Sequence, residues 1–417
     1  MARTTNDHSR GPSAEDQPLS SLSGGERILA LDVLRGFAIL GILLVNVMVF
    51  SGAWGLEPPE EYASALGADE ILGLLVFIFA EGKFINSLAF LFGIGFTLQA
   101  MRADERGLSS KRLLLRRMIG LGLIGIVHAV LIWSGDILLS YALLGLVLIA
   151  FRNRRPKNLL TWAVCLIGVL ALPLTLVAIG LVFSGAGSAA ASGTGGIGFI
   201  EELERSAMAA YNSGSYPQMV LQRLKEIAVF AIAGLIMAPA LLAMMLAGAA
   251  VARSGIVERL DSHSALIRRA AVAGLGVGLP LNILYSASLV VDPQGAGAAG
   301  AGGLLCWLVG APTLAVGYMA ALTLLVRSGF AVSALRRVAA VGRLALTNYL
   351  TQSVVMTSIF YGFSIYGRIG LIPAMSIAVA LLAMQLLVSP IYLRHFSHGP
   401  VEWLWRRFTY GPRKHAA

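Results

Sequence analysis

Charged residues are scarce in this sequence: Asp, Glu, Lys and Arg make up 13% of the 417 residues. Hydrophobic residues make up 57%, and the mean hydropathy is +0.77. Soluble globular domains carry about 25% charged residues. The scarcity of charge therefore excludes a soluble protein and predicts a chain that resides in the lipid bilayer.

Cysteine is nearly absent as well. The two cysteines, Cys165 and Cys306, lie within apolar runs with no metal-ligating partner nearby in sequence. We therefore expect them to be small core hydrophobes, and we expect no metal site. The chain also lacks soluble-enzyme motifs such as a nucleophile elbow or a P-loop.

Long apolar runs are what the sequence has in abundance. They recur at about 20 residues each, which is typical of membrane-crossing helices rather than of the alternating strands of a barrel. We predict an all-α polytopic membrane protein with about ten transmembrane helices. The predicted spans are residues 28–50, 70–99, 112–133, 136–151, 158–183, 219–251, 265–291, 303–327, 343–362 and 369–393.

Two connections have distinctive features. The span 70–99 is long for a straight crossing and contains Glu81-Gly82-Lys83 in its middle, which predicts a tilt or a local break. The spans 112–133 and 136–151 are joined by little more than Trp133 to Asp136, which predicts an antiparallel hairpin.

The basic residues indicate the topology. Most of the 32 Lys and Arg residues fall in alternate loops and at the two ends of the chain. By the positive-inside rule both termini of this multi-pass protein should be cytoplasmic. This pattern explains the net charge of +10, so we assign no nucleic-acid partner. The expected partners are the lipid bilayer and a small-molecule substrate. The sequence leaves the oligomeric state open, with a homodimer as one option.

The chain divides into three parts. Residues 1–26 are polar and contain no apolar signal-peptide core, which predicts a flexible cytoplasmic arm rather than a cleaved signal. Residues 27–393 form the ten-helix domain, and residues 394–417 form a cytoplasmic tail. The outer loop, 184–216, begins as a Gly/Ala/Ser-rich linker and ends in an acidic, helical patch, and the sequence leaves open whether this patch covers a cavity.

The first span carries three polar residues on one face. At a helical step of roughly 100° per residue, Asp32, Arg35 and Asn46 fall within about 60° of one another. A charge in hydrocarbon costs about 3 kcal/mol or more, so this stripe should face the bundle interior or a watery cavity. Asp32 and Arg35 either neutralise each other or line a binding site.

The second span also carries polar residues in mid-membrane. Lys83 and Asn86 share a face, and a buried ammonium needs a partner, for which Asp32, Glu81 or an anionic ligand group are candidates. An interhelical ion pair or a snorkelling lysine explains the same pattern without a ligand.

His128 is the only histidine within a predicted span, and Asp136 follows it at the tip of the hairpin. A histidine with a nearby carboxylate is suited to general-base catalysis, because its unperturbed pKa is near neutrality. The alternative is that His128 is a core packing residue whose hydrogen-bonding groups have partners.

On the ninth span, Asn348 and Gln352 share a polar face that either contacts substrate or joins helices.

Four blocks in order, LDVLRGFAILGILLVN, KFINSLAFLFGIGF, HAVLIWSGDILLSYALLG and GPVEWLWRRFTYG, resemble the YeiB-like family of bacterial inner-membrane proteins (domain of unknown function 418). The resemblance runs from Arg27 to Pro412. It implies a multi-pass protein of the bacterial cytoplasmic (inner) membrane. What it implies about function is limited to a transport label.

The first span is also similar, more distantly, to heparan-α-glucosaminide N-acetyltransferase-like membrane acyltransferases, through Arg27, Asp32, Arg35, Gly36 and Asn46. This resemblance implies a helical bundle that passes an acyl group from acyl-CoA on one side to a sugar-like acceptor on the other. It carries a catalytic role over to Asn46.

The family's histidine does not carry over. Eleven residues past Asn46 this chain has Glu57, so either His128 or Glu57 takes the base role, or the bundle lacks the chemistry.

We therefore expect a membrane acyltransferase with acyl-CoA as the donor substrate. Asn46, His128 and Asp136 are the expected catalytic residues. The expected substrate-binding residues are Asp32, Arg35, Glu81, Lys83, Asn86, Asn348 and Gln352. The alternative is a transporter of a small anionic or amphipathic solute that uses Arg35, Glu81 and Lys83, and a third option is a lipid-binding partner without turnover.

Overall fold

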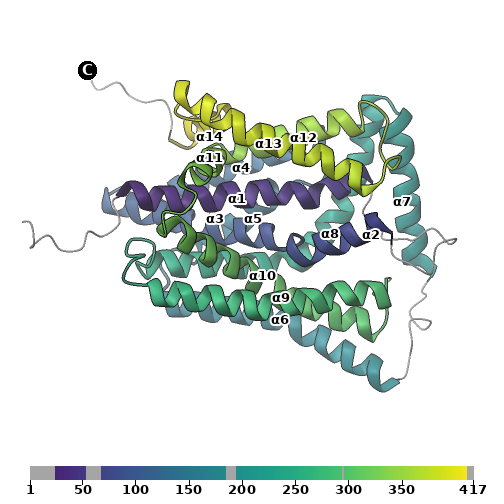
Figure 1. Ribbon diagram of the computed structural model, residues 1–417, viewed down its shortest axis with the longest axis horizontal. Helices are drawn as coiled ribbons and strands as arrows, with labels where there is room; N and C mark the ends of the chain where they lie inside the picture. Colours follow the sequence, from purple (N-terminus) through teal and green to yellow (C-terminus); the bar gives the residue numbers. More distant parts are fainter. Residues whose placement is uncertain (1–23, 53–66, 185–193, 294, 411–417) are drawn as a thin grey trace, which may run out of the picture.

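The computed structural model describes residues 24–52, 67–184, 194–293 and 295–410, and the regular structure in these ranges is helical (Figure 1). The helices are α1 (Gly24–Ser51), α2 (Ala68–Phe79), α3 (Lys83–Glu105), α4 (Ser110–Leu131), α5 (Leu138–Ile149), α6 (Pro156–Ser184), α7 (Thr194–Ser213), α8 (Tyr216–Arg253), α9 (Ser264–Val291), α10 (Ala298–Arg327), α11 (Val332–Arg343), α12 (Ala345–Phe360), α13 (Leu371–His395) and α14 (Pro400–Tyr410).

This is a multi-pass membrane protein. In the described part of the chain, 8 helical segments are long and apolar enough to cross a bilayer. The other two predicted spans correspond to α5, with 12 residues, and α12, with 16 residues. At 1.5 Å per residue these helices are about 18 and 24 Å long, which is less than the hydrocarbon thickness of about 30 Å. The count of ten crossings stays a prediction.

The predicted irregularity in the second span is a break in the helix. Helix α2 ends at Phe79 and α3 begins at Lys83, with Gly82 between them at φ 76°. A positive φ of this size favours glycine, because a Cβ would clash with the backbone.

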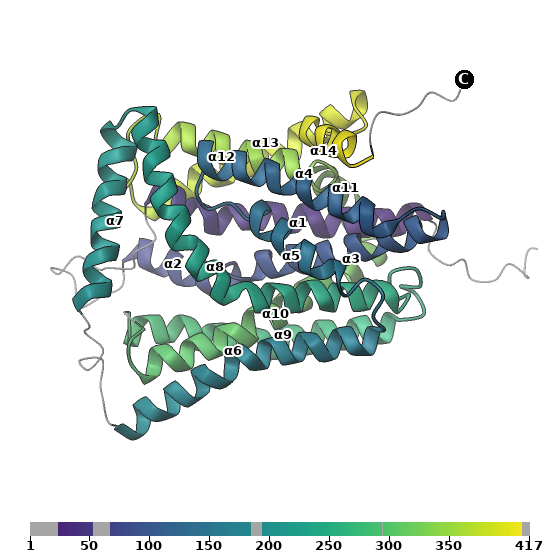
Figure 2. The same ribbon diagram turned by 180° about the vertical axis from the view of Figure 1, so that it is seen from behind.

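The two ends of the bundle differ. Helix α1 begins at the end where α14 lies, and α7 lies across the opposite end (Figures 1 and 2). We call these the α14 end and the α7 end. Helix α7 matches the helical patch expected late in the loop 184–216. The segment predicted as a tail, 394–417, is partly structured, because Pro400–Tyr410 forms α14 and packs on α4 and α12.

The predicted hairpin is present, and its tip folds back into the bundle. Helix α4 ends at Leu131, yet the backbone nitrogen of Leu139 lies only 2.5 Å from where a Cβ on Gly125 would stand. Gly125 is six residues, or about 9 Å, before the end of α4. Residues 132–137 therefore return toward the interior, and α5 begins at that depth.

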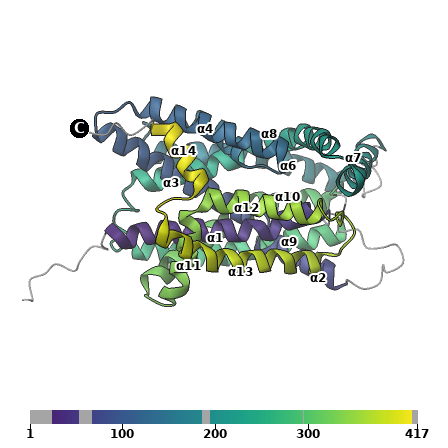
Figure 3. The same cartoon turned by 90° about the horizontal axis from the view of Figure 1, so that it is seen from above.

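Close helix contacts hold α1 in the centre (Figure 3). A Cβ on Gly36 would stand 1.9 Å from the carbonyl oxygen of Val338, and one on Gly342 would stand 1.9 Å from that of Asp32. Two glycines thus allow α1 and α11 to touch through their backbones.

Helix α6, in contrast, lies at the periphery with large apolar side chains such as Val164 and Phe183 exposed, as a lipid-facing helix requires.

We expect Gly36→Ala to lower the thermal unfolding midpoint of the detergent-purified protein, because the added methyl group overpacks the α1–α11 contact at a cost of about 1–3 kcal/mol. The matched control is Gly276→Ala in α9, where a Cβ meets nothing within 4 Å. An equal or larger loss of stability in Gly276→Ala would contradict this account of the packing.

Candidate functional site

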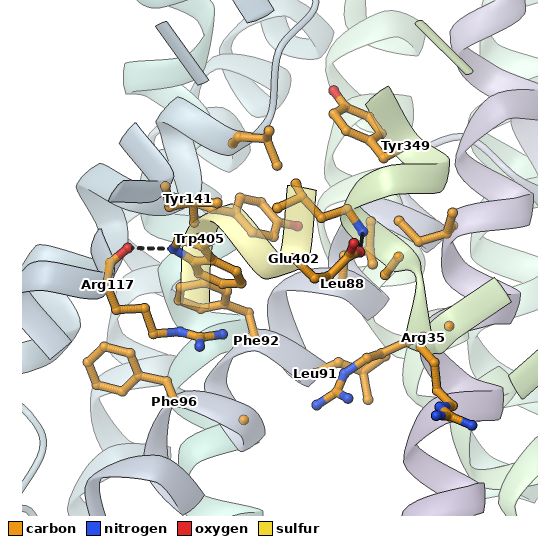
Figure 4. A pocket seen from close by; sticks show the side chains of 18 of the residues that line it. Arg35, Leu88, Leu91, Phe92, Phe96, Arg117, Tyr141, Tyr349, Glu402 and Trp405 are labelled. Atoms are coloured by element: carbon orange, nitrogen blue, oxygen red, sulfur yellow. Dashed lines mark hydrogen bonds between the residues drawn. The ribbon is translucent and has the colours of Figure 1, made fainter. Parts of the chain in front are cut away.

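A cavity of about 330 Å³ lies at the α14 end, between α1, α3, α4, α5, α11, α12 and α14 (Figure 4). Its walls are mostly apolar, with side chains such as Leu88, Leu91, Phe92 and Phe96. The basic residues that line it are Arg35, Arg117, Arg343, Arg406 and His398, and Glu402 is the one acidic residue in the lining.

The cavity runs from an exposed basic mouth to a buried aromatic end. Arg343 and Arg406 are exposed, whereas Tyr141 and Tyr349 are 5% and 1% exposed. Along α3 the lining extends from Leu88 to Gln99, or about 16 Å. An anionic group would therefore bind at the mouth, and an apolar chain would fit behind it.

Helix α14 closes one side of the cavity. The indole nitrogen of Trp405 donates to the carbonyl oxygen of Arg117 at 2.9 Å, and the guanidinium of Arg117 lies 3.8 Å from the Trp405 ring centroid. Glu402 accepts the backbone N–H groups of Leu346 and Thr347 at 2.8 and 3.0 Å, in the first turn of α12. These contacts join α14 to the two helices on either side of the cavity.

His128 and Asp136 lie together, as their positions on the hairpin predict. The Nδ1 atom of His128 is 3.2 Å from Oδ1 of Asp136, and both side chains are at least 98% buried. Asp136 also accepts the N–H groups of Leu138 and Leu139, the first two residues of α5, at 2.7 and 3.0 Å. The Nε2 atom of His128 is buried and has no hydrogen-bond partner in the described part of the chain. This pair has the arrangement of a base and its orienting carboxylate.

Tyr349 connects the cavity to this pair. It lines the inner end of the cavity, and its ring centroid is 5.3 Å from that of His128. Its hydroxyl oxygen accepts the N–H of Ile137 at 3.4 Å. Nothing in the sequence singled out Tyr349, since one tyrosine in an apolar helix has no distinctive pattern.

Asn46 is half-buried and is not part of the cavity lining. It lies one turn before Phe50, whose ring centroid is 4.1 Å from that of Trp133, and Trp133 packs against His128 with ring centroids 6.4 Å apart. Asn46 is therefore on the α7 side of the cavity, and its catalytic role stays a prediction. Glu57, the other candidate base, lies outside the described residues.

Asp32 and Arg35 form an ion pair, with Nη1 and Oδ1 3.3 Å apart. Arg35 also lines the cavity, whereas Asp32 is 8% exposed and is not part of the lining. The two side chains therefore pair with each other, as one interpretation predicts, and Arg35 also lines a cavity, as the other predicts.

The residues at the α2–α3 break form a separate cluster. The ammonium of Lys83 is fully buried and donates to the carbonyl oxygen of Phe77 at 2.5 Å, and Glu81 accepts a hydrogen bond from Trp307. Asn86 donates to the carbonyl oxygen of Gly82 at 2.6 Å. None of the three predicted residues, Glu81, Lys83 and Asn86, lines the cavity.

Asn348 and Gln352 connect helices. The side chain of Gln352 donates to Gln385 on α13 at 2.9 Å and to the carbonyl oxygen of Ile39 on α1 at 3.2 Å. Asn348 donates to Ser389 on α13 at 3.2 Å. These contacts fit the interpretation that both residues join helices.

The α7 end carries a buried carboxylate that was not predicted from the sequence. Glu226 on α8 accepts hydrogen bonds from Ser134 at 2.5 Å and from Tyr211 on α7 at 2.7 Å. Burial raises the pKa of the nearby Tyr366 well above its ordinary value. The position of Glu226, an acidic residue inside a predicted span, is the sequence signal that could have identified it.

In the described ranges, no cluster of His, Cys, Asp and Glu could hold a metal ion.

The comparisons with known proteins agree with the resemblance seen in the sequence. The family model "Protein of unknown function (DUF418)" matches residues 251–412. The uncharacterized protein YxaH of Bacillus subtilis (strain 168) is 35% identical over 408 residues, which cover 92% of this chain and 94% of YxaH. The chain belongs to the DUF418 family.

Other relatives match over nearly their whole length. The uncharacterized protein YeiB of Escherichia coli (strain K12) is 29% identical over 411 residues, covering 92% of this DUF418 chain and 96% of YeiB. An uncharacterized 39.9 kDa protein of Bacillus acidopullulyticus is 27% identical over 397 residues, covering 92% of this chain and 94% of that protein. No solved structure matches the chain.

We expect Asp136→Ala to destabilise this DUF418 protein by about 1–2 kcal/mol, as the loss of a helix cap does, because the first N–H groups of α5 lose their acceptor. The thermal unfolding midpoint measures the effect. Asp261→Ala is the control, because Asp261 is 44% exposed and pairs with Arg327, and such an ion pair contributes about 0–1 kcal/mol. Equal midpoints for the two variants would contradict the role given to Asp136.

Proposed function

We propose that this protein is a membrane acyltransferase that takes the acyl group from acyl-CoA. The observation that carries the proposal is the cavity, whose arginine-lined mouth leads to Tyr349, which packs on the His128–Asp136 pair. The distribution of Lys and Arg supports a cytoplasmic location for the α14 end, where acyl-CoA is available.

The donor would bind with its charged part at the mouth. Arg35, Arg117, Arg343 and Arg406 carry the guanidinium groups that hold phosphates by charge-assisted hydrogen bonds. The pantetheine arm and the acyl group would occupy the apolar part between α3 and α4. The thioester would then lie near Tyr349 and the unpartnered Nε2 of His128.

The transfer needs one base that also acts as an acid. His128 takes the proton from an acceptor hydroxyl or amine at Nε2 while the acceptor atom bonds to the thioester carbon. Asp136, on Nδ1, orients the ring and stabilises its charged form. When the C–S bond breaks, the proton passes from Nε2 to the departing CoA sulfur, so the products are the acylated acceptor and free CoA. In this proposal Asn46 contacts the reacting groups from the α7 side of the cavity.

We expect acetyl-CoA to bind the detergent-purified protein, with Arg35→Ala and Arg343→Ala each weakening the affinity about tenfold or more. A charge-assisted hydrogen bond contributes about 1.5–3 kcal/mol, and 1.4 kcal/mol is a factor of ten. Isothermal titration calorimetry measures the affinity. The control is Arg336→Ala, on the exposed face of α11 outside the cavity.

The absence of binding to folded wild-type protein would contradict the proposal. So would an equal loss of affinity in Arg336→Ala, because the cavity arginines would then have no special role.

The alternative function, transport of a small anionic or amphipathic solute, is supported by the break between α2 and α3. Discontinuous helices with polar residues in mid-membrane form the substrate sites of many transporters. Glu81, Lys83 and Asn86 lie at this break, and the Oδ1 atom of Asn86 is buried without a partner in the described ranges. The two functions differ in the fate of the solute: a transporter moves it unchanged across a proteoliposome membrane, whereas the enzyme returns it with an added acyl group.

A further inference from the structure

Tyr349 lies between the cavity and the His128–Asp136 pair. It is 1% exposed, it lines the inner end of the cavity, and its ring packs against that of His128. In Figure 4, Tyr349 lies at the opposite end of the cavity from Arg117 and Arg35. A thioester that reaches the pair from the mouth must therefore come next to this tyrosine.

The hydroxyl proton of Tyr349 is free to donate. The oxygen accepts the N–H of Ile137, so that contact leaves the proton unused, and no described residue accepts it. A buried hydroxyl proton without an acceptor costs free energy unless a ligand or water supplies one. Tyr141, the other buried tyrosine of the lining, differs, because its hydroxyl donates to the carbonyl oxygen of Ile85 at 2.7 Å.

We propose that Tyr349 is a catalytic residue whose hydroxyl donates a hydrogen bond to the thioester carbonyl oxygen of the acyl donor. This inference rests on the proposed acyltransferase function. As the acceptor oxygen bonds to the carbonyl carbon and its proton moves to His128, the electron pair of the C=O bond moves onto the carbonyl oxygen. Tyr349 stabilises that negative charge. The C=O bond re-forms when the C–S bond breaks, and Tyr349 keeps its own proton throughout.

The position of Tyr349 explains how a donor that enters through the cavity meets a stabilising group. Asn46, the residue to which the sequence resemblance gives a catalytic role, is not part of the lining. Tyr349 is, and it contacts the proposed base as well. The tyrosine therefore supplies the hydrogen bond from the cavity side.

The test compares wild-type protein, Tyr349→Phe and Tyr318→Phe in lipid nanodiscs with acetyl-CoA as the probe. Tyr318 lies on α10 outside the cavity, and its hydroxyl donates to the carbonyl oxygen of Phe79 at 3.2 Å. The readouts are acetyl-CoA affinity by calorimetry and CoA release by a thiol reagent, with water as the acceptor. We expect Tyr349→Phe to lower kcat by about 10²–10³-fold, the usual effect of losing one oxyanion donor, with affinity and KM changed less than about threefold. Tyr318→Phe, which removes a hydroxyl outside the cavity that is already bonded to the backbone, should lower kcat less than about threefold.

The outcomes separate this inference from the proposed function. If wild-type protein releases CoA and Tyr349→Phe retains that rate, Tyr349 is not the donor and the acyltransferase proposal stands. If folded wild-type protein binds acetyl-CoA and releases no CoA, the acyltransferase proposal fails and the role of Tyr349 fails with it.

A second substitution covers the case in which Tyr349→Phe folds poorly. Incorporation of 3-fluorotyrosine at position 349 keeps the shape of the side chain and makes the hydroxyl a stronger donor. A changed kcat with an unchanged KM supports the inference, and an unchanged kcat overturns it.

Discussion

The carboxylate of Asp136 is the group on which the interior of this bundle depends. It lies inside the membrane region, where no bulk water is available to accept a backbone N–H. By accepting the N–H groups of Leu138 and Leu139 it lets α5 begin below the surface, and the same carboxylate holds His128 at 3.2 Å. One charged side chain thus fixes the end of a helix and the orientation of the proposed base.

Glu402 has the same role at the start of α12. It accepts the N–H groups of Leu346 and Thr347, so α12 begins one turn before Tyr349 and short of the full membrane thickness. The cavity lies between the starts of these two short helices, and residues from both line it: Leu138 and Tyr141 on α5, and Leu346 on α12. A bundle with two full-length helices in these places would have a filled interior. The two internal helix starts are therefore what leaves room for a ligand.

Local sequence patterns were enough to predict part of this arrangement. The Glu81-Gly82-Lys83 break could be predicted because glycine between charged residues interrupts an apolar run. The contact of His128 with Asp136 followed from their places on a tight hairpin. The full shortness of α5 could not be predicted: the predicted span 136–151 has 16 residues, and the folding back of residues 132–137 leaves a helix of 12 residues.

The cavity depends on contacts between distant parts of the chain. Trp405 meets Arg117 across 288 positions, and Glu402 meets Leu346 across 56. Hydropathy places the residues after 393 outside the membrane, so the sequence predicted a tail there instead of a wall of the site. Tyr349, Arg343 and Arg406 were missed for the same reason, whereas Arg35 was predicted because it shares a polar stripe with Asp32. Their significance comes from which helices meet, and periodicity along one helix carries no information on that.

The most direct measurement is a cryo-electron microscopy structure of the protein with bound acetyl-CoA. Our account predicts density for the phosphates among Arg35, Arg117, Arg343 and Arg406, with the thioester next to Tyr349 and His128. Ligand density at the α2–α3 break or at the α7 end, with the α14-end cavity empty, would contradict it.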